Sequence, residues 1–116
     1  MKFLRIHRLL NKEEYHELYN SGKKYVGSKI IIFYRLAQSS NPKLGITITK
    51  KWGKAYRRNR FKRVVREAYR HESLKLPPNI ELNVHPRKHY EKLLPKEVQL
   101  DLRMLATICD RKCFGI

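Results

Sequence analysis

Acidic side chains that could gather into a hydrolytic site are few in this sequence. The aspartates are Asp101 and Asp110, both near the C-terminus, and the glutamates are scattered along the chain. Phosphodiester hydrolysis by a protein usually requires clustered carboxylates that hold divalent metal ions, or a histidine–lysine acid–base pair. No pair of acids here has a spacing that suits such a site. We therefore expect no catalytic residue in this chain.

Cysteine and histidine do not offer a better metal site. Cys109 and Cys113 lie four residues apart without a second pair of ligands nearby, and none of the five histidines has a metal-ligand spacing relative to them. In a cytosolic chain the thiols are expected to stay reduced. The sequence thus predicts no metal ion and no cofactor held tightly by the protein.

Basic residues dominate the composition. The chain of 116 residues has 27 Lys and Arg against 10 Asp and Glu, a formal net charge of +17. A compact domain with this charge repels itself unless a polyanion compensates it, and phosphate backbones are the commonest such partner. An anionic membrane is the main alternative, but no stretch approaches the roughly 20 apolar residues of a spanning helix. Arg5, His7 and Arg8 interrupt the apolar start, so we expect no signal peptide, no membrane partner and a cytoplasmic location.

The positive charge is concentrated between Lys54 and Arg70, where eight residues are basic and one, Glu67, is acidic. The apolar residues of this segment recur with the spacing of one helical face, a stripe about 140° wide at about 100° per residue. They are Phe61, Val64, Val65, Ala68 and Tyr69. The opposite side of the same helix would carry Asn59, Arg63, Arg66 and Arg70, with Arg60 and Lys62 on its two flanks.

A solvated helix face is the ordinary explanation for a run of charges. Such a face usually mixes both signs, because like charges at i, i+4 destabilise a helix by a few tenths of a kcal/mol. Here cations also crowd the N-terminal half, where the helix dipole disfavours them. Arginine outnumbers lysine six to two, which suits bidentate contacts with phosphate. The pattern therefore favours phosphate binding over mere solubility.

The remaining elements follow from periodicity and turn residues. We expect a first helix capped by Asn11 and ended by Ser21-Gly22, strands over 23–26, 30–36, 44–48 and 80–86, and a final helix from Pro95. The strand over 44–48 should close a hairpin with the strand before it, because Ser39-Ser40-Asn41-Pro42 are turn residues. The final helix should bury Val98, Leu102, Leu105 and Cys109 on one face. The order α-β-β-β-α-β-α over residues 1–116 predicts a single domain with an α/β or α+β two-layer sandwich.

The motif around the basic helix closely resembles the RNR signature of the protein subunit of bacterial ribonuclease P. It consists of Gly53-Lys54-Ala55, then Arg58-Asn59-Arg60, Lys62-Arg63, Arg66-Glu67 and Arg70. The first helix with its aromatics, the Lys50-Lys51 lead-in and the later strand also come in that family's order. The resemblance covers roughly residues 5–110 and is most specific between Leu44 and Arg70. Tyr56 and Phe61 depart from the family pattern, which usually has smaller aliphatic residues there.

This resemblance implies a fold like that of domain 2 of ribosomal protein S5, with a left-handed βαβ crossover through the basic helix. Right-handed crossovers are the default, so periodicity alone does not predict this hand. The resemblance also implies that the basic helix and the lysines before it bind the catalytic RNA. The residues concerned are Lys50, Lys51, Lys54, Arg57, Arg58, Asn59, Arg60, Lys62, Arg63, Arg66 and Arg70.

The resemblance further implies a cleft between the sheet and the first helix that receives the 5′ leader of precursor tRNA. Tyr15 and Tyr19 match the family's helix aromatics, and Phe33 or Tyr34 matches its strand aromatic. Stacking of bases on aromatic rings tolerates sequence variation and is worth roughly 1–3 kcal/mol per base. Taken alone, Tyr15 and Tyr19 would fill the core as readily as they would form such a platform.

By this resemblance the chain is expected to be an RNA-binding subunit of the ribonucleoprotein that removes the 5′ leader from precursor tRNA. The RNA and its magnesium ions would hydrolyse the phosphodiester bond, and the protein would strengthen and broaden substrate binding while being inactive alone. A basic ribosomal or general RNA-packaging protein is the alternative, since it would share size and charge without this Arg-Asn-Arg spacing. A DNA-binding module that reads the major groove is disfavoured, because the helix lacks a helix-turn-helix partner.

Overall fold

The computed structural model describes residues 12–36, 43–77 and 79–113. Its elements are α1 (Lys12–Ser21), β1 (Lys23–Val26), β2 (Ile30–Leu36), β3 (Lys43–Ile46), α2 (Ala55–Glu72), β4 (Ile80–Pro86) and α3 (Pro95–Cys113), with short 3₁₀ turns η2 (Lys50–Trp52), η3 (Ser73–Lys75) and η4 (Tyr90–Lys92). This order of helices and strands is the predicted one. The expected cap of α1 at Asn11 lies outside the described residues.

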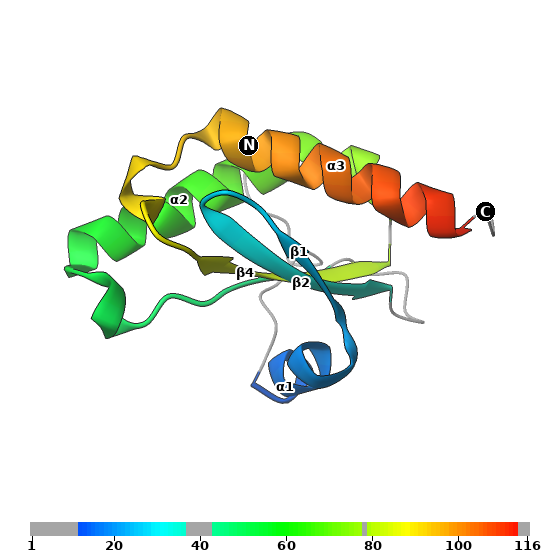
Figure 1. The fold of residues 1–116 in the computed structure, drawn as a ribbon, viewed down its shortest axis with the longest axis horizontal. Helices are drawn as coiled ribbons and strands as arrows, with labels where there is room; N and C mark the ends of the chain where they lie inside the picture. The colour runs from blue at the N-terminus through cyan, green and yellow to red at the C-terminus, as the bar shows by residue number, and fades with distance from the viewer. Residues whose placement is uncertain (1–11, 37–42, 78, 114–116) are drawn as a thin grey trace.

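The strands form one mixed sheet in the order β1-β2-β4-β3. The pairs β1–β2 and β2–β4 are antiparallel, and β3–β4 is parallel. Because α2 connects the two parallel strands, β3–α2–β4 is a βαβ unit; its left hand stays a prediction. In Figure 1, α2 and α3 lie side by side on one face of the sheet and α1 lies on the other. The predicted α+β class is confirmed.

The predicted hairpin between β2 and β3 is wrong, because β4 lies between these two strands. Turn residues over 39–42 are a local signal and do not determine which strand the next one pairs with. The strand β4 is central and parallel to β3, and it is buried on both faces. Ile80, Leu82 and Val84 are buried, and so are the polar Glu81 and Asn83 that alternate with them.

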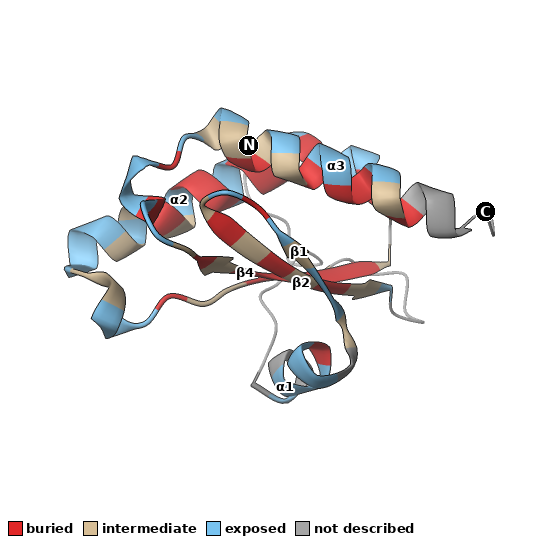
Figure 2. Ribbon diagram, in the orientation of Figure 1, coloured by how far each residue is buried: buried red, intermediate tan, exposed pale blue. Residues whose placement is uncertain are grey.

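The main core lies between the sheet and the inner faces of α2 and α3 (Figure 2). On α2 the buried apolar residues are the predicted stripe, Phe61, Val64, Val65, Ala68 and Tyr69. On α3 they include the predicted Val98, Leu102, Leu105 and Cys109. Because this stripe is packed against the sheet, α2 cannot rotate about its axis, and its basic side stays toward solvent.

The helix α1 contacts the opposite face of the sheet, in part through one buried leucine and one arginine. Leu18 is fully buried. Arg35 on β2 donates from Nε to Glu81 on β4 at 2.7 Å and from a terminal nitrogen to Glu17 on α1 at 3.2 Å. Glu81 is buried, and a buried carboxylate requires such a partner. Arg35 therefore joins the buried Glu81 of β4 to the exposed Glu17 of α1.

Candidate nucleic-acid interface

The predicted RNA-binding residues all lie on η2, on α2 or on the two residues between them. The exposed ones are Lys50, Lys51, Lys54, Arg57, Asn59, Arg63, Arg66 and Arg70, and the half-buried ones are Arg58, Arg60 and Lys62. The half-buried Arg60 and Lys62 are the two that the helical periodicity placed on the flanks. The structure thus gathers the predicted set on one helix and the turn that precedes it, a surface we call the basic face of α2.

The turn that enters α2 is fixed by the first arginine of the motif. Nε of Arg58 donates to the carbonyl oxygen of Gly53 at 3.1 Å. Gly53 has φ 130° and ψ −169°, a conformation that is essentially restricted to glycine. A Cβ atom at this position would lie 3.0 Å from the hydroxyl oxygen of Tyr90. The glycine of the motif is therefore required by the backbone and by its neighbour.

Tyr90 of η4 supports this turn from the other side. Its hydroxyl donates to the main-chain carbonyl of Trp52. Its ring packs edge-on against the rings of Trp52 and Phe61, with centroids 5.7 Å apart in both pairs. Sequence reasoning missed Tyr90, because the contact with Trp52 spans 38 residues and no local pattern marks it.

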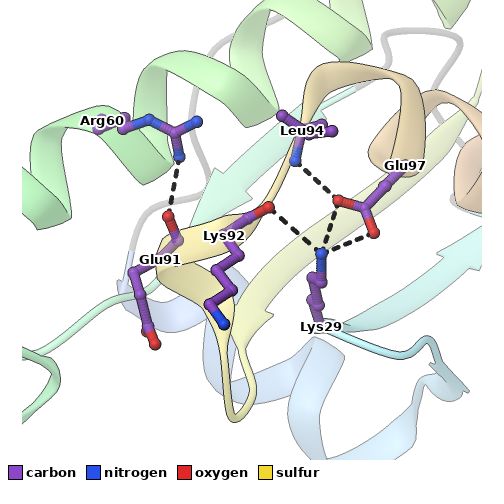
Figure 3. Close-up of polar contacts among 6 residues, drawn as sticks. All are labelled: Lys29, Arg60, Glu91, Lys92, Leu94 and Glu97. Atoms are coloured by element: carbon purple, nitrogen blue, oxygen red, sulfur yellow. Dashed lines mark hydrogen bonds and ion pairs between the residues drawn. The ribbon is translucent and has the colours of Figure 1, made fainter.

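The same η4 turn also holds Arg60 (Figure 3). A terminal nitrogen of its guanidinium donates to the main-chain carbonyl of Glu91 at 3.4 Å. A guanidinium has five N–H donors, so Arg58 and Arg60 keep donors for phosphate after these internal contacts. Both side chains are held by main-chain carbonyls, so their substitution would disturb the protein as well as any contact with RNA.

Lys29 fixes η4 and the start of α3 against the turn between β1 and β2 (Figure 3). Its Nζ donates to the carbonyl of Lys92 at 3.2 Å and forms an ion pair with Glu97 at 2.9 Å. Glu97 also accepts from the backbone N–H of Leu94 at 2.9 Å, which satisfies a free donor at the start of α3. The hydrogen bond from Lys29 lowers the pKa of Glu97. These contacts hold the η4 turn whose Glu91 carbonyl accepts from Arg60.

Arg63 and Arg66 differ from the arginines at the start of α2. Both are exposed, and neither side chain has a hydrogen-bond or ion-pair partner among the described residues. Their charges are therefore available to an external anion. Substitution of these two arginines would therefore test binding of phosphate without removing a hydrogen bond or ion pair within the described part of the protein.

A second surface lies on the sheet face beside α1. Phe33 of β2 is half-buried there, with its ring centroid 5.1 Å from that of Tyr19 and 4.9 Å from that of His85. Tyr19 is 56% exposed, so it is not a core residue. The side chain of Tyr15 lies outside the described part of the chain. We call Tyr19, Phe33 and His85 the aromatic face.

Tyr34 does not belong to the aromatic face, and the prediction that offered it beside Phe33 is wrong for this residue. Successive side chains of a strand point to opposite faces, so Tyr34 lies on the side of α2 and α3. It is 6% exposed and belongs to the core. Burial raises the pKa of its phenol.

A polar network that sequence reasoning did not assign completes the aromatic face. The side-chain nitrogen of Asn83 donates to the hydroxyl of Thr47 at 3.0 Å and lies 3.1 Å from Nε2 of His85. Burial lowers the pKa of His85, so the ring is neutral near pH 7 and its Nε2 can accept from Asn83. Asn83 and His85 lie two residues apart on β4, a spacing that predicts a shared face, but only the strand register shows that Phe33 shares it.

The described residues contain neither a cluster suited to a metal ion nor a helix suited to crossing a membrane. In that part of the chain no cluster of three or more histidine, cysteine, aspartate or glutamate side chains could hold a metal ion. None of the helices described is long and apolar enough to cross a membrane. Cys109 is a free, buried thiol in the core, and the side chain of Cys113 is outside the described set.

Comparison with known proteins gives a consistent result. The family model described as Ribonuclease P matches residues 3–110. The chain is 35% identical over 97 residues to the ribonuclease P protein component of Oleidesulfovibrio alaskensis, covering 82% of this chain and 75% of that one. It is 35% identical over 112 residues to that of Pseudoalteromonas atlantica, covering 96% and 92%. The solved ribonuclease P protein of Thermotoga maritima superposes with a TM-score of 0.74 at 28% identity, covering 85% of this chain and 94% of that one. The chain belongs to the family of ribonuclease P protein components.

Proposed function

We propose that this chain binds the RNA subunit of ribonuclease P through the basic face of α2 and assists removal of the 5′ leader from precursor tRNA. The observation that carries the proposal is the one-sided construction of α2. Its apolar stripe is buried against the sheet, while Arg63, Arg66 and their basic neighbours remain exposed. A rigid helix with cations on one side matches a phosphate backbone in charge and in shape.

Neutralised phosphates give this binding a measurable signature. Each phosphate contact releases condensed counterions, so the logarithm of affinity falls linearly with the logarithm of salt concentration, by roughly 0.7–0.9 per contact. Membership of the family and the match of its Arg58-Asn59-Arg60 motif support the RNA subunit as the partner, in preference to a general RNA-packaging role.

The aromatic face is the proposed site for the single-stranded leader. Tyr19 offers an exposed ring and Phe33 a half-buried one on the same surface, and stacking on such rings does not depend on base identity. The neutral His85 lies beside them, and the buried Asn83 is positioned to hydrogen-bond its ring. A surface of this kind suits leaders whose sequences vary between substrates.

The RNA subunit and its magnesium ions are proposed to perform the hydrolysis, because several carboxylates of the protein already have structural roles. These pairs are Glu72 with Arg103 at 2.8 Å, Glu81 with Arg35 at 2.7 Å, Glu97 with Lys29 at 2.9 Å, and Asp101 with the hydroxyl of Tyr25 at 3.3 Å. Their positions are set by the fold, and no group of three or more acidic, histidine or cysteine side chains among the described residues could hold a metal ion. The protein then contributes affinity and orientation.

Reconstitution with a bacterial ribonuclease P RNA tests the proposal. Leader removal is measured at low magnesium concentration with RNA alone, with protein alone and with both. We expect the complex to be active where RNA alone is poorly active, and the protein alone to be inactive. The Arg63→Gln/Arg66→Gln double variant should lose most of the stimulation, whereas Lys23→Gln, which removes one exposed charge from β1, should retain it. Magnesium-dependent cleavage by RNA-free protein would contradict the division of roles.

A further inference from the structure

Tyr56 is an exposed aromatic residue on the basic face of α2. Its side chain is 65% exposed, whereas Phe61 and Tyr69, the other aromatics of this helix, are each 1% exposed. At about 100° per residue, Tyr56 lies about 150° from the middle of the apolar stripe and within about 60° of Asn59, Arg60 and Arg63. The ring is therefore directed to the same side as the arginines.

Packing within the protein does not account for this ring. Among the described residues, its hydrogen bond and its cation–π contact are both with the neighbouring Arg57, whose guanidinium carbon lies 5.8 Å from the ring centroid and whose Nε donates to the Tyr56 hydroxyl at 3.4 Å. Arg57 is itself exposed, so this pair is solvated and contributes little to stability. An exposed ring with a cation beside it is instead suited to an external planar partner.

The charge around Tyr56 limits the chemistry of that partner. Lys54 and Arg57 are exposed next to it, Arg63 is exposed two helical turns further along the same side, and no acid lies in the first turn of the helix. Arg60, one helical turn further on, is about 6 Å along the axis at 1.5 Å per residue. An anionic chain that also carries flat rings satisfies both features, and a single-stranded stretch of RNA is such a chain.

We propose that Tyr56 is a stacking site for an unpaired nucleobase of the RNA that docks on α2, with the adjoining phosphates bound by Arg57 and Arg60. The inference rests on the proposed function and deepens it, because it requires RNA on this helix and adds a local feature of that RNA. A continuous duplex presents phosphates but no open base face. The docked RNA must therefore expose a bulged or unpaired nucleotide at the N-terminal end of α2.

Fluorescence offers a direct test, because the chain has a single tryptophan, Trp52. In a Trp52→Phe background, Tyr56→Trp places the only indole at the proposed site. Addition of ribonuclease P RNA should quench its emission, because a stacked base quenches indole, and a fully paired RNA duplex should not. The matched control in the same background is Leu74→Trp, at a position that is 99% exposed beyond the other end of α2; its emission should stay unchanged. Equal responses at the two positions, or none at Tyr56→Trp, would overturn the proposal.

Affinity provides the second test and separates this inference from the proposed function. Tyr56→Phe should bind the RNA like the parent protein, whereas Tyr56→Leu should bind roughly five- to hundredfold more weakly, the range expected for one stacked base. The salt dependence should be the same for both, since neither change removes a charge. If Arg63→Gln weakens binding but Tyr56→Leu does not, the stacking site is wrong and the proposed function stands. If neither change weakens binding, the docking surface itself is wrong.

Discussion

The Nε atom of Arg58 donates to the carbonyl of Gly53 at 3.1 Å, and this hydrogen bond distinguishes Arg58 from Arg63 of the same helix. The acceptor belongs to the turn that sets where the helix begins. Arg63, by contrast, is exposed and has no such partner among the described residues. Arg58 thus forms a hydrogen bond within the protein, whereas Arg63 is available to an external anion.

Substitution of each arginine by glutamine should separate its effect on stability from its effect on RNA binding. Arg58→Gln removes a charged donor from the turn, so we expect the free energy of unfolding to fall by about 1 kcal/mol. Arg63→Gln should leave stability within about 0.5 kcal/mol of the parent. Both changes should reduce the salt dependence of RNA binding by about one unit per lost phosphate contact. Urea unfolding and binding titrations at several salt concentrations measure the two effects.

Equal stability of the two variants would show that the contact between Arg58 and Gly53 does not stabilise the turn. An unchanged salt dependence in Arg63→Gln would show that this arginine does not meet phosphate. Lys23→Gln on β1 is the control for the general loss of one positive charge.

Gly53→Ala is expected to destabilise the protein by about 1–3 kcal/mol, because alanine is strained in the conformation that Gly53 adopts. The added Cβ would also lie 3.0 Å from the Tyr90 hydroxyl oxygen. Part of the loss should therefore disappear when the substitution is made in a Tyr90→Phe background. Denaturant unfolding of the four proteins in this cycle measures both parts. A full loss in both backgrounds would assign the cost to the backbone alone.

The features that could be predicted from the sequence are those determined by residues close together along the chain. The stripe on α2 follows from helical periodicity, and Phe61, Val65 and Ala68 are buried as that periodicity requires. The basic face then follows, since it is the other side of the same helix. The spacing from Gly53 to Arg70 identified the family, because it is a local pattern with many fixed positions.

The features that could not be predicted depend on contacts between distant segments. Turn residues before β3 suggested a hairpin with β2, but β3 pairs with β4, which comes after α2 in the chain. The choice between Phe33 and Tyr34 depends on strand register, because a shift of one residue exchanges the two faces. The contacts of Tyr90 with Trp52 and of His85 with Phe33 likewise join separate elements.

The aromatic face gives a prediction about substrate discrimination. Tyr19→Leu and Phe33→Leu should each weaken binding of precursor tRNA to the reconstituted complex by roughly five- to hundredfold, the range for one lost stacking contact. Mature tRNA has no leader, so its affinity should not change. Tyr34→Phe is the control, because that ring lies in the core on the opposite side of the sheet. Equal losses for precursor and mature tRNA would place the two aromatics outside the leader site.

His85 gives a prediction about pH. Burial lowers the pKa of its ring below the ordinary value of 6.5, so between the folded pKa and 6.5 the unfolded chain binds more protons than the folded one. The free energy of unfolding then rises with pH in this window. The stabilisation is fully present above pH 6.5 and is lost as pH falls through the folded pKa, where protonation of Nε2 removes the acceptor facing Asn83.

We expect the ring resonances of His85 to titrate with a midpoint below 6.5 in NMR spectra. We also expect His85→Gln to lose less stability than the parent on acidification from about pH 7.5 to about pH 5. A midpoint at or above 6.5 would mean that the ring is not desolvated on this face, and the neutral imidazole proposed beside the leader would have to be abandoned.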